Sequence, residues 1–339
     1  MSRRIYVAYT GGTIGMAPTA DGYAPRAGFL GQQLAAMPEL RHPSMPAFDL
    51  DEYDLLLDSA NMVPGDWVRI AQDIARRYDD YDGFVVLHGT DTMAYTASAL
   101  PFLLPGLARP VILTGSQIPL CELRTDAREN LIAALLLAAG EPIPEVCLFF
   151  GGRLLRGCRS VKVNASGFDA FDSPNYPPLG VAGIDLTINW PLVRRPDPAA
   201  VFRPLRPRLD TTVGALRLFP GISAQVVRNM LQPPLQGLVL EAYGAGNAPD
   251  RNRDLLAAIA EATERGVVIV DCTQCLRGTV DLEAYATGAA LARAGVISGY
   301  DLTAEAALAK LFCLLGAGHS PDETRALMQQ DLAGELTRP

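Results

Sequence analysis

The first β-rich run of the chain reads Ile5-Tyr6-Val7-Ala8-Tyr9 and leads directly into Thr10-Gly11-Gly12-Thr13-Ile14-Gly15. A second apolar run, residues 84–87, leads into His88-Gly89-Thr90-Asp91-Thr92. In both places a strand pattern ends in a glycine-containing turn that carries hydroxyl side chains. The carboxyl ends of strands in open α/β sheets face the ligand crevice, so we expect the two turns to meet at one site.

Strand and helix patterns alternate through both halves of the sequence, which predicts βαβ units, parallel sheets and right-handed crossovers. In the first half we expect strands at 5–9, 53–57, 84–87, 111–113 and 146–150, and helices at 67–78, 94–104 and 127–139. In the second half we expect strands at 213–219, 237–242 and 267–271, and helices at 222–231, 250–265, 303–315 and 320–331. Residues 16–30 show no periodicity and are expected to form a long loop, of the kind that often closes over a site.

A stretch rich in proline and arginine, residues 191–211, disfavours both helix and central strand and is interpreted as a linker. It separates a predicted N-terminal domain, 1–190, from a predicted C-terminal domain, 212–339. The predicted fold class is α/β, with a mostly parallel sheet flanked by helices in the larger N-terminal domain. The smaller C-terminal domain is also predicted to be α/β.

The composition is that of a compact globular protein, with 49% hydrophobic and 19% charged residues among 339. A net charge of −8 without a basic run gives no electrostatic support for binding nucleic acid or an anionic membrane. No secretory signal pattern and no apolar segment of about 20 residues is found, so we expect a cytoplasmic protein. The six scattered cysteines are then expected to be mostly buried free thiols.

Thr13 is the sharper candidate for a nucleophile, because Gly11 and Gly12 let a ligand approach the backbone beside its hydroxyl. The alternative is an ordinary strand-to-helix turn in which Thr13 caps a helix. Tyr23, in the 16–30 segment, is either a packing residue or a group that closes over Thr13 and exchanges protons with it. No histidine lies in or next to the first motif, so the base that activates Thr13 is not expected to be an imidazole.

The second turn pairs the Thr90 hydroxyl with the Asp91 carboxylate, which could hold an ammonium group of a substrate or of a lysine. Asp91 and Thr92 could instead cap the helix that follows. Asp58 and Ser59 add an acid and a hydroxyl at the end of the 53–57 strand. Three strand ends of this kind form a polar pocket suited to a small zwitterion.

Lysine is scarce in this chain: it occurs only at positions 162 and 310, and the other 27 of the 29 basic residues are arginine. A lysine kept where arginine is otherwise used suggests a need for its titratable amine. Beside Thr90 and Asp91, Lys162 could accept a hydroxyl proton. The alternative is an ordinary surface lysine.

Metal and nucleotide sites find little support. Cys272 and Cys275 have CxxC spacing, but no second pair or nearby histidine completes a zinc site. Gly244-Ala-Gly246-Asn247 follows a strand pattern, yet Pro249 stands where the third dinucleotide glycine belongs. We therefore expect no metal site. His88, directly after an apolar strand, is expected to be structural.

Residues 9–15 and 87–93 resemble the two signature motifs of the bacterial-type asparaginase/glutaminase family. Residues 114–119, Lys162 ahead of 167–171, and residues 243–249 extend the resemblance nearly end to end, and it is closest to the cytoplasmic type I L-asparaginases. The resemblance implies hydrolysis of L-asparagine to L-aspartate and ammonia through a threonine β-aspartyl ester. It also implies an enzyme without cofactors that acts as a homodimer or homotetramer on a small-molecule substrate.

Residue by residue, the resemblance implies that Thr13 is the nucleophile and that Tyr23 is the mobile-loop tyrosine near it. Thr90, Asp91 and Lys162 correspond to a hydroxyl, carboxylate and amine group with proton-transfer and water-activating roles. Which group deprotonates Thr13 is left open.

The substrate's α-carboxylate and α-ammonium groups are implied to bind at Asp58, Ser59 and Asp91, with Thr90 also in the pocket. Ala60 stands where close relatives often carry a polar residue, so only its backbone could contact the substrate. Backbone N–H groups near Thr13 and Thr90 are the expected oxyanion hole.

Three residues of the C-terminal half carry further implications of the resemblance. Asn247 is similar to a residue that reaches across a subunit interface. Glu241 and Cys275 mark the region of a second, allosteric asparagine site in some cytoplasmic relatives. Glu241 stands where those relatives have an arginine, which weakens the case for regulation.

Three alternatives accompany this interpretation. One is the amidase subunit of a tRNA-dependent amidotransferase, although such relatives carry extra sequence ahead of the first motif, which here begins at residue 9. Another is a glutaminase-asparaginase of broader range, since the two substrates differ by one methylene group. The last is a protein that binds asparagine without hydrolysing it.

Overall fold

The computed structural model describes residues 3–20, 22–140, 142–195 and 199–338. It divides into two compact units, Met1–Pro204 and Leu205–Pro339. The division falls within the predicted linker 191–211, of which residues 196–198 lie outside the described residues. Each unit is considered by itself below.

The N-terminal unit is built on a sheet with the strand order β12-β11-β8-β7-β6-β5-β1-β4. Its parallel part consists of β4 (Ala47–Leu57), β1 (Arg4–Gly11), β5 (Gly83–Leu87), β6 (Val111–Thr114) and β7 (Val146–Phe150). The antiparallel part consists of β8 (Arg153–Arg156), β11 (Gly180–Ala182) and β12 (Leu186–Ile188). The central strands are buried on both faces, which is why their sequences are continuously apolar. The predicted mostly parallel sheet is confirmed.

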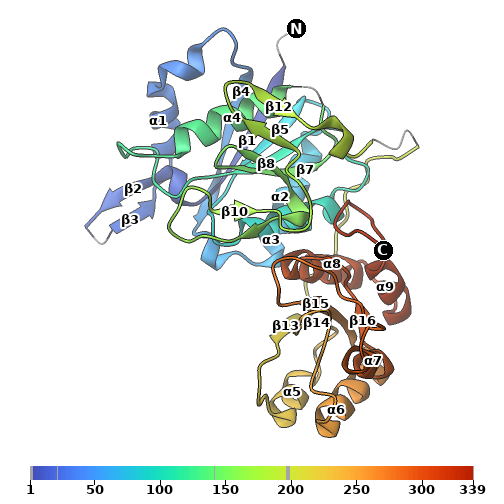
Figure 1. The fold of residues 1–339 in the computed structure, drawn as a ribbon. Helices are drawn as coiled ribbons and strands as arrows, with labels where there is room; N and C mark the ends of the chain where they lie inside the picture. The colour runs from blue at the N-terminus through green and yellow to red at the C-terminus, as the bar shows by residue number, and fades with distance from the viewer. Residues whose placement is uncertain (1–2, 21, 141, 196–198, 339) are drawn as a thin grey trace. The chain divides into compact units, whose positions relative to one another are not determined.

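Helices cover this sheet (Figure 1): α1 (Phe29–Ala36), α2 (Pro64–Arg76), α3 (Met93–Leu103) and α4 (Ala127–Ala139). One hydrophobic core joins Leu30 of α1 and Leu131 of α4 to Ile5 and Val7 of β1. These two strand residues alternate along β1, as a strand with one face against this core requires. The predicted helices at 67–78, 94–104 and 127–139 are confirmed, with ends that differ by up to three residues.

The expectation of a long irregular loop at 16–30 is wrong. Two short strands, β2 (Met16–Thr19) and β3 (Gly22–Pro25), pair antiparallel and project from the unit in Figure 1. Gly22 adopts a φ of 112°, which only glycine takes readily. Strands of four residues that contain Pro18 and Pro25 are too short and too irregular for an alternating pattern, and proline is tolerated only at such sheet edges.

The remaining elements of this unit are short. β9 (Val161–Lys162) and β10 (Phe171–Asp172) form a separate antiparallel pair. The 3₁₀ turns are η1 (Thr13–Gly15), η2 (Pro38–Arg41), η3 (Ser59–Asn61), η4 (Gly157–Arg159) and η5 (Trp190–Leu192). Two of these turns, η1 and η3, follow directly on neighbouring strands and carry candidate site residues.

The C-terminal unit has a wholly parallel sheet of order β13-β14-β15-β16, with its own hydrophobic core. Its strands are β13 (Val213–Arg217), β14 (Gly237–Ala242), β15 (Val268–Thr273) and β16 (Ile297–Ser298). Its helices are α5 (Ala224–Met230), α6 (Arg253–Glu264), α7 (Ala286–Arg293), α8 (Ala304–Gly316) and α9 (Pro321–Met328). The sequence did not predict α7 or β16, because an alanine-rich helix of eight residues and a strand of two residues lack a clear apolar stripe.

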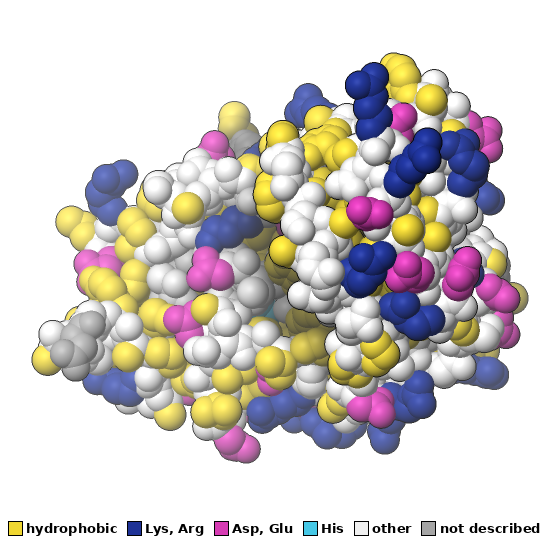
Figure 2. All heavy atoms as spheres, turned by 90° about the horizontal axis from the view of Figure 1, so that it is seen from below, with side chains coloured by type: hydrophobic (Ala, Val, Ile, Leu, Met, Phe, Trp, Pro, Cys, Tyr) yellow, Lys and Arg dark blue, Asp and Glu magenta, His cyan; other side chains and the backbone are white. Residues whose placement is uncertain are grey.

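Within the described ranges, no helix is long and apolar enough to cross a membrane. On the face of the molecule seen in Figure 2, lysine and arginine side chains lie among aspartate and glutamate side chains. Charge on this face is therefore mixed.

Asp271, near the end of β15, has a completely buried carboxyl group, and neither of its oxygens has a hydrogen-bond partner among the described residues. Burial disfavours the charged form and raises the pKa of Asp271 to about 8. The same carboxyl titrates near pH 4 in the unfolded chain, at about 3.9. The folded state binds this proton more tightly, so the free energy of unfolding falls as the pH rises from about 4 to about 8.

Asp271→Asn is expected to remove this fall, because an amide of nearly the same volume does not ionise. At pH 8 the variant should be more stable than the parent protein by up to about 5 kcal/mol, and near pH 4 the two should be similar. Urea unfolding at both pH values measures the difference in stability. Asp254→Asn, the same substitution at an exposed position of α6, is the control. An equal stability difference at both pH values would contradict the assignment.

Candidate active site

Three turns meet at the carboxyl ends of the neighbouring strands β4, β1 and β5. Gly12, with a φ of 90°, lies so close to the next turn that a Cβ atom added to it would stand 2.3 Å from the backbone nitrogen of Gly89. A Cβ atom on Gly89 would stand 2.5 Å from the Ser59 hydroxyl. The glycines are therefore required for close approach, and the two hydroxyl motifs converge as predicted.

Thr13 is the first residue of η1, and its side chain is partly exposed. Among the described residues its hydroxyl makes no hydrogen bond, and it does not cap η1, whose N-cap is Gly12. The hydroxyl of Thr10 differs, since it is buried and donates to the Leu87 carbonyl at 3.0 Å. The turn therefore contains one structural hydroxyl and one hydroxyl that is available to a ligand.

Thr90, Asp91 and Lys162 form one hydrogen-bonded group. The Lys162 Nζ donates to Thr90 Oγ1 at 2.9 Å and to Asp91 Oδ1 at 2.7 Å. Lys162 comes from β9, more than 70 residues away in the sequence, and its side chain is 20% exposed. The alternative of an ordinary surface lysine is therefore wrong.

The alternative in which Asp91 or Thr92 caps the following helix is also wrong in the described structure. Thr92 is the N-cap of α3, yet no side-chain capping bond forms there among the described residues. The Thr92 hydroxyl donates to the Ser59 carbonyl at 2.8 Å, and the Asp91 carboxylate accepts from Lys162. Both residues are engaged in joining turns rather than in ending the helix.

The 58–60 segment lies against the Asp91 turn. Ser59 is buried, and its Oγ accepts from the Asp91 backbone N–H at 3.3 Å, which leaves the Ser59 hydroxyl proton available. Asp58 is exposed, and its Oδ1 accepts from the Ala60 backbone N–H at 3.1 Å. The second oxygen of Asp58 and the carbonyl of Ala60 are what these two residues can offer a ligand.

Tyr23 lies on β3, and its hydroxyl donates to Glu122 Oε1 at 2.6 Å. The hydrogen bond to Glu122, together with desolvation and the negative charge, raises the pKa of Tyr23. In this conformation Tyr23 faces Glu122, and no hydrogen bond to Thr13 is formed among the described residues. The sequence did not indicate Glu122 as a site residue. It lies in the loop after β6, far from Tyr23 in the sequence, and nothing in its local sequence indicates a contact with Tyr23.

His88 is completely buried, and burial lowers its pKa to about 4, so the ring is neutral at neutral pH. Its Nδ1 lies 2.7 Å from the Gly89 carbonyl, which can only accept, so Nδ1 carries the proton. Its Nε2 then accepts from the Thr96 hydroxyl at 2.8 Å. His88 therefore holds the second turn in place, which agrees with the expected structural role.

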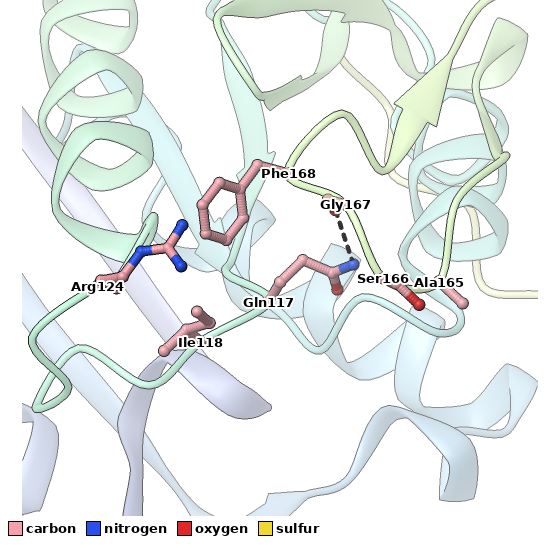
Figure 3. Close-up of a pocket in the computed structure, with 7 residues that line it drawn as sticks. All are labelled: Gln117, Ile118, Arg124, Ala165, Ser166, Gly167 and Phe168. Carbon is pink, nitrogen blue, oxygen red and sulfur yellow. Dashed lines mark hydrogen bonds between the residues drawn. The ribbon is translucent and has the colours of Figure 1, made fainter.

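Gln117, in the loop after β6, is a further site residue. From the sequence it is named only as part of the family motif at 114–119, without a role of its own. Its Oε1 accepts from Thr90 Oγ1 at 3.1 Å. It also borders a cavity of about 440 Å³ (Figure 3) whose lining includes Arg124 and Phe168. β6 is the next strand beyond β5, so its carboxyl end lies at the same edge of the sheet as the other site residues. The position of Gln117 after this predicted strand is the signal by which the sequence could have indicated it.

Asn247, Glu241 and Cys275 lie in the C-terminal unit. The Asn247 Oδ1 accepts from the Thr287 hydroxyl at 2.6 Å, the Glu241 carboxylate lies 3.4 Å from the Arg217 guanidinium, and Cys275 is exposed. Among the described residues, no group of three or more histidine, cysteine, aspartate or glutamate side chains could hold a metal ion. Cys272 and Cys275 therefore have no further ligands in the described part of the chain.

Two family models together match most of the chain. The model described as asparaginase, N-terminal, matches residues 4–194, and the glutaminase/asparaginase C-terminal domain matches residues 212–328. This chain belongs to the asparaginase family. Within that family it is 53% identical, over 336 residues, to L-asparaginase 1 of Escherichia coli (strain K12), a match that spans 99% of this chain and 98% of that protein.

Structural similarity within the asparaginase family extends over the whole chain. The crystal structure of L-asparaginase I from Vibrio cholerae matches with a TM-score of 0.90 and 52% sequence identity, and all of both chains is covered. The thermostable L-asparaginase from Thermococcus kodakarensis matches with a TM-score of 0.87 and 37% identity, over 99% of this chain and all of that one. Both of these structures therefore share the fold of this chain from end to end.

Proposed function

We propose that this chain is an L-asparaginase, which hydrolyses L-asparagine to L-aspartate and ammonia through an ester on Thr13. The observation that carries the proposal is the Thr13 hydroxyl, which has no hydrogen-bond partner among the described residues and belongs to a turn packed against the Gly89–Thr90 turn. Thr90 itself accepts a hydrogen bond from Lys162. The 53% identity to L-asparaginase 1 of E. coli supports the substrate class. The reaction is of the acyl-transfer type, with two successive displacements at one carbonyl carbon.

In the first displacement, the Thr13 oxygen bonds to the carbon of the substrate's side-chain amide, the C–N bond breaks, and the Thr13 proton leaves with ammonia. In the second, a water oxygen bonds to the ester carbon, the bond to Thr13 breaks, and Thr13 regains a proton from the water. Thr90, Asp91 and Lys162 are proposed to manage these proton movements. Backbone N–H groups of the two packed turns are suited to stabilise the oxyanion.

The substrate is proposed to lie between the three turns. The free oxygen of Asp58 and the Asp91 carboxylate are acceptors for the α-ammonium group, and the Ser59 hydroxyl proton is a donor for the α-carboxylate. Ala60 can contribute only backbone. Tyr23 is proposed to approach Thr13 when the β2–β3 pair that carries it moves, which requires its bond to Glu122 to break.

The localisation, oligomeric state and regulation of the chain are also proposed. None of the six cysteines, all of which the structure describes, forms a disulfide, which suits the proposal of a reducing cytoplasm. A homodimer or homotetramer, with Asn247 reaching across an interface, rests on the family resemblance. Light scattering on the purified chain tests the number of protomers. Regulation at Glu241 and Cys275 is proposed to be absent or altered, because Glu241 already pairs with Arg217.

The deciding experiment measures ammonia release from L-asparagine, L-glutamine and D-asparagine, each over a wide concentration range. L-asparagine is expected to be the best substrate, and one additional methylene group is expected to lower kcat/KM by about 10-fold to 200-fold. Equal kcat/KM values for asparagine and glutamine would favour the broader glutaminase-asparaginase. Binding of asparagine in calorimetry without ammonia release would favour a non-catalytic binding protein and overturn the proposal.

A further inference from the structure

The backbone of Gln117, between β6 and α4, is anchored by hydrogen bonds to Asp126. The backbone N–H groups of Gln117 and Ile118 both donate to the Asp126 carboxylate, at 3.0–3.1 Å. Asp126 also accepts from the side-chain amide of Asn130 at 3.3 Å. The Gln117 side chain therefore starts from a fixed point, one strand away from the Thr90 turn.

The orientation of the Gln117 amide is determined by its second contact. Its Nε2 lies 3.1 Å from the Gly167 carbonyl oxygen, the hydrogen bond drawn in Figure 3. A carbonyl oxygen can only accept, so the NH₂ group must face Gly167, and Oε1 must face Thr90. Gln117 is therefore a hydrogen-bond acceptor for the Thr90 hydroxyl.

The Thr90 hydroxyl is consequently fixed in direction. A hydroxyl has one proton and two lone pairs, and an ammonium group has only protons to offer. Lys162 donates to one lone pair of Thr90, and the Thr90 proton points to Gln117. The second lone pair is left with a set direction and no partner among the described residues.

We propose that Gln117 is a positioning residue for the hydrolytic half of the reaction. By accepting the hydrogen bond from the Thr90 hydroxyl, Gln117 orients Thr90 so that a lone pair of its oxygen faces the attacking water. The water donates one hydrogen bond to Thr90 while its oxygen bonds to the ester carbon, and its other proton passes to the Thr13 oxygen as the ester bond breaks. This inference rests on the proposed function, because it assumes the ester on Thr13.

The test is the partition of the ester between water and hydroxylamine, with L-asparagine as substrate. Hydroxylamine is a stronger nucleophile that depends less on orientation by Thr90. Gln117→Met has a similar length and no strong acceptor, and is expected to raise the ratio of aspartyl hydroxamate to aspartate about 10-fold, the factor that corresponds to one lost hydrogen bond. A purely structural role would lower the formation of both products equally and leave the ratio unchanged.

Two further variants sharpen the outcome. Gln117→Glu keeps an acceptor for Thr90, replaces the donor to Gly167 by an acceptor oxygen and adds a negative charge. Because the acceptor for Thr90 is retained, its ratio should stay closer to that of the parent protein than the ratio of Gln117→Met. Ser166→Ala changes the exposed residue next to Gly167 and should leave the ratio unchanged. If Gln117→Met does not fold, Gln117→Ala replaces it. Gln117 borders the cavity, so shortening its side chain to alanine only enlarges a space that is already open.

The outcomes separate this inference from the proposed function. If the parent protein forms no hydroxamate at all, the ester on Thr13 is contradicted. If it forms hydroxamate and the ratio is the same in Gln117→Met, the positioning role of Gln117 is overturned while the ester stands. A ratio in Gln117→Glu as high as that in Gln117→Met would also overturn the role, because the variant that keeps the acceptor for Thr90 would then behave like the one that lacks it.

Discussion

Thr13→Val is expected to lower ammonia release from L-asparagine by at least about 10⁴-fold, the scale seen when a catalytic nucleophile is removed. Valine matches threonine in shape but has no oxygen to bond to the amide carbon. The Thr13 hydroxyl makes no hydrogen bond among the described residues, so its removal should leave stability nearly unchanged. A steady-state ammonia assay with a thermal unfolding curve on the same sample measures both properties.

Two variants control for changes in the turn itself. Thr13→Ser keeps a hydroxyl and should retain measurable turnover. Thr10→Val removes the hydroxyl that donates to Leu87, so it should lower stability by about 1 kcal/mol without abolishing the chemistry. A folded Thr13→Val variant with turnover near that of the parent protein would refute the nucleophile assignment.

Lys162→Met is expected to lower kcat by about 10²-fold to 10⁴-fold, the range for the loss of a group that moves protons. Methionine keeps the length of the side chain but cannot donate to Thr90 or pair with Asp91. The pair with Asp91 is partly exposed, with 61% of the Asp91 side chain accessible, so its contribution to stability is about 0–1 kcal/mol. The expected signature is a large loss of turnover and a changed pH profile with little change in stability.

Lys310, the second lysine, provides a contrast within the same chain. It lies on α8, and its side chain is completely buried, pairs with Glu335 and donates to the backbone carbonyls of Met328 and Gln330. Lys310→Met leaves Glu335 buried without its cation and should cost about 3–5 kcal/mol of stability. Lost stability with retained turnover in Lys310→Met, and the reverse in Lys162→Met, would separate the two roles. Unchanged kcat and pH profile in Lys162→Met would count against its proposed part in proton transfer.

Much of the N-terminal site could be predicted from local sequence. Thr13 and Thr90 stand out because a strand of continuous apolar residues ends in glycine and a hydroxyl, and parallel strands bring such ends to one edge of the sheet. Lys162 stands out because lysine is otherwise replaced by arginine. These signals are properties of single segments or of composition, so they need no knowledge of which loops touch.

The features that sequence reasoning missed or mistook depend on contacts between distant segments. The paired strands β2 and β3 are too short to produce a periodic pattern. Glu122, which accepts the hydrogen bond of Tyr23, lies 99 residues away from Tyr23 in the sequence. The assumed helix cap at Asp91 gave way to Lys162, because a nearby cation attracts a carboxylate more strongly than backbone N–H groups do. From the sequence alone, Asp271 is an ordinary residue at the end of a predicted strand. Its complete burial depends on the tertiary structure.

By itself the sequence determined the α/β alternation, the two hydroxyl turns and the family to which the chain belongs, since each is written in residues close together along the chain. Only the tertiary structure decided which threonine hydroxyl lacks a partner among the described residues, in which direction the Thr90 hydroxyl donates and which carboxyl groups are buried. The physical reason is that hydrogen bonding and desolvation act over a few ångströms in space. Gln117 and Lys162 therefore become partners of Thr90 only when the fold brings distant segments of the chain together.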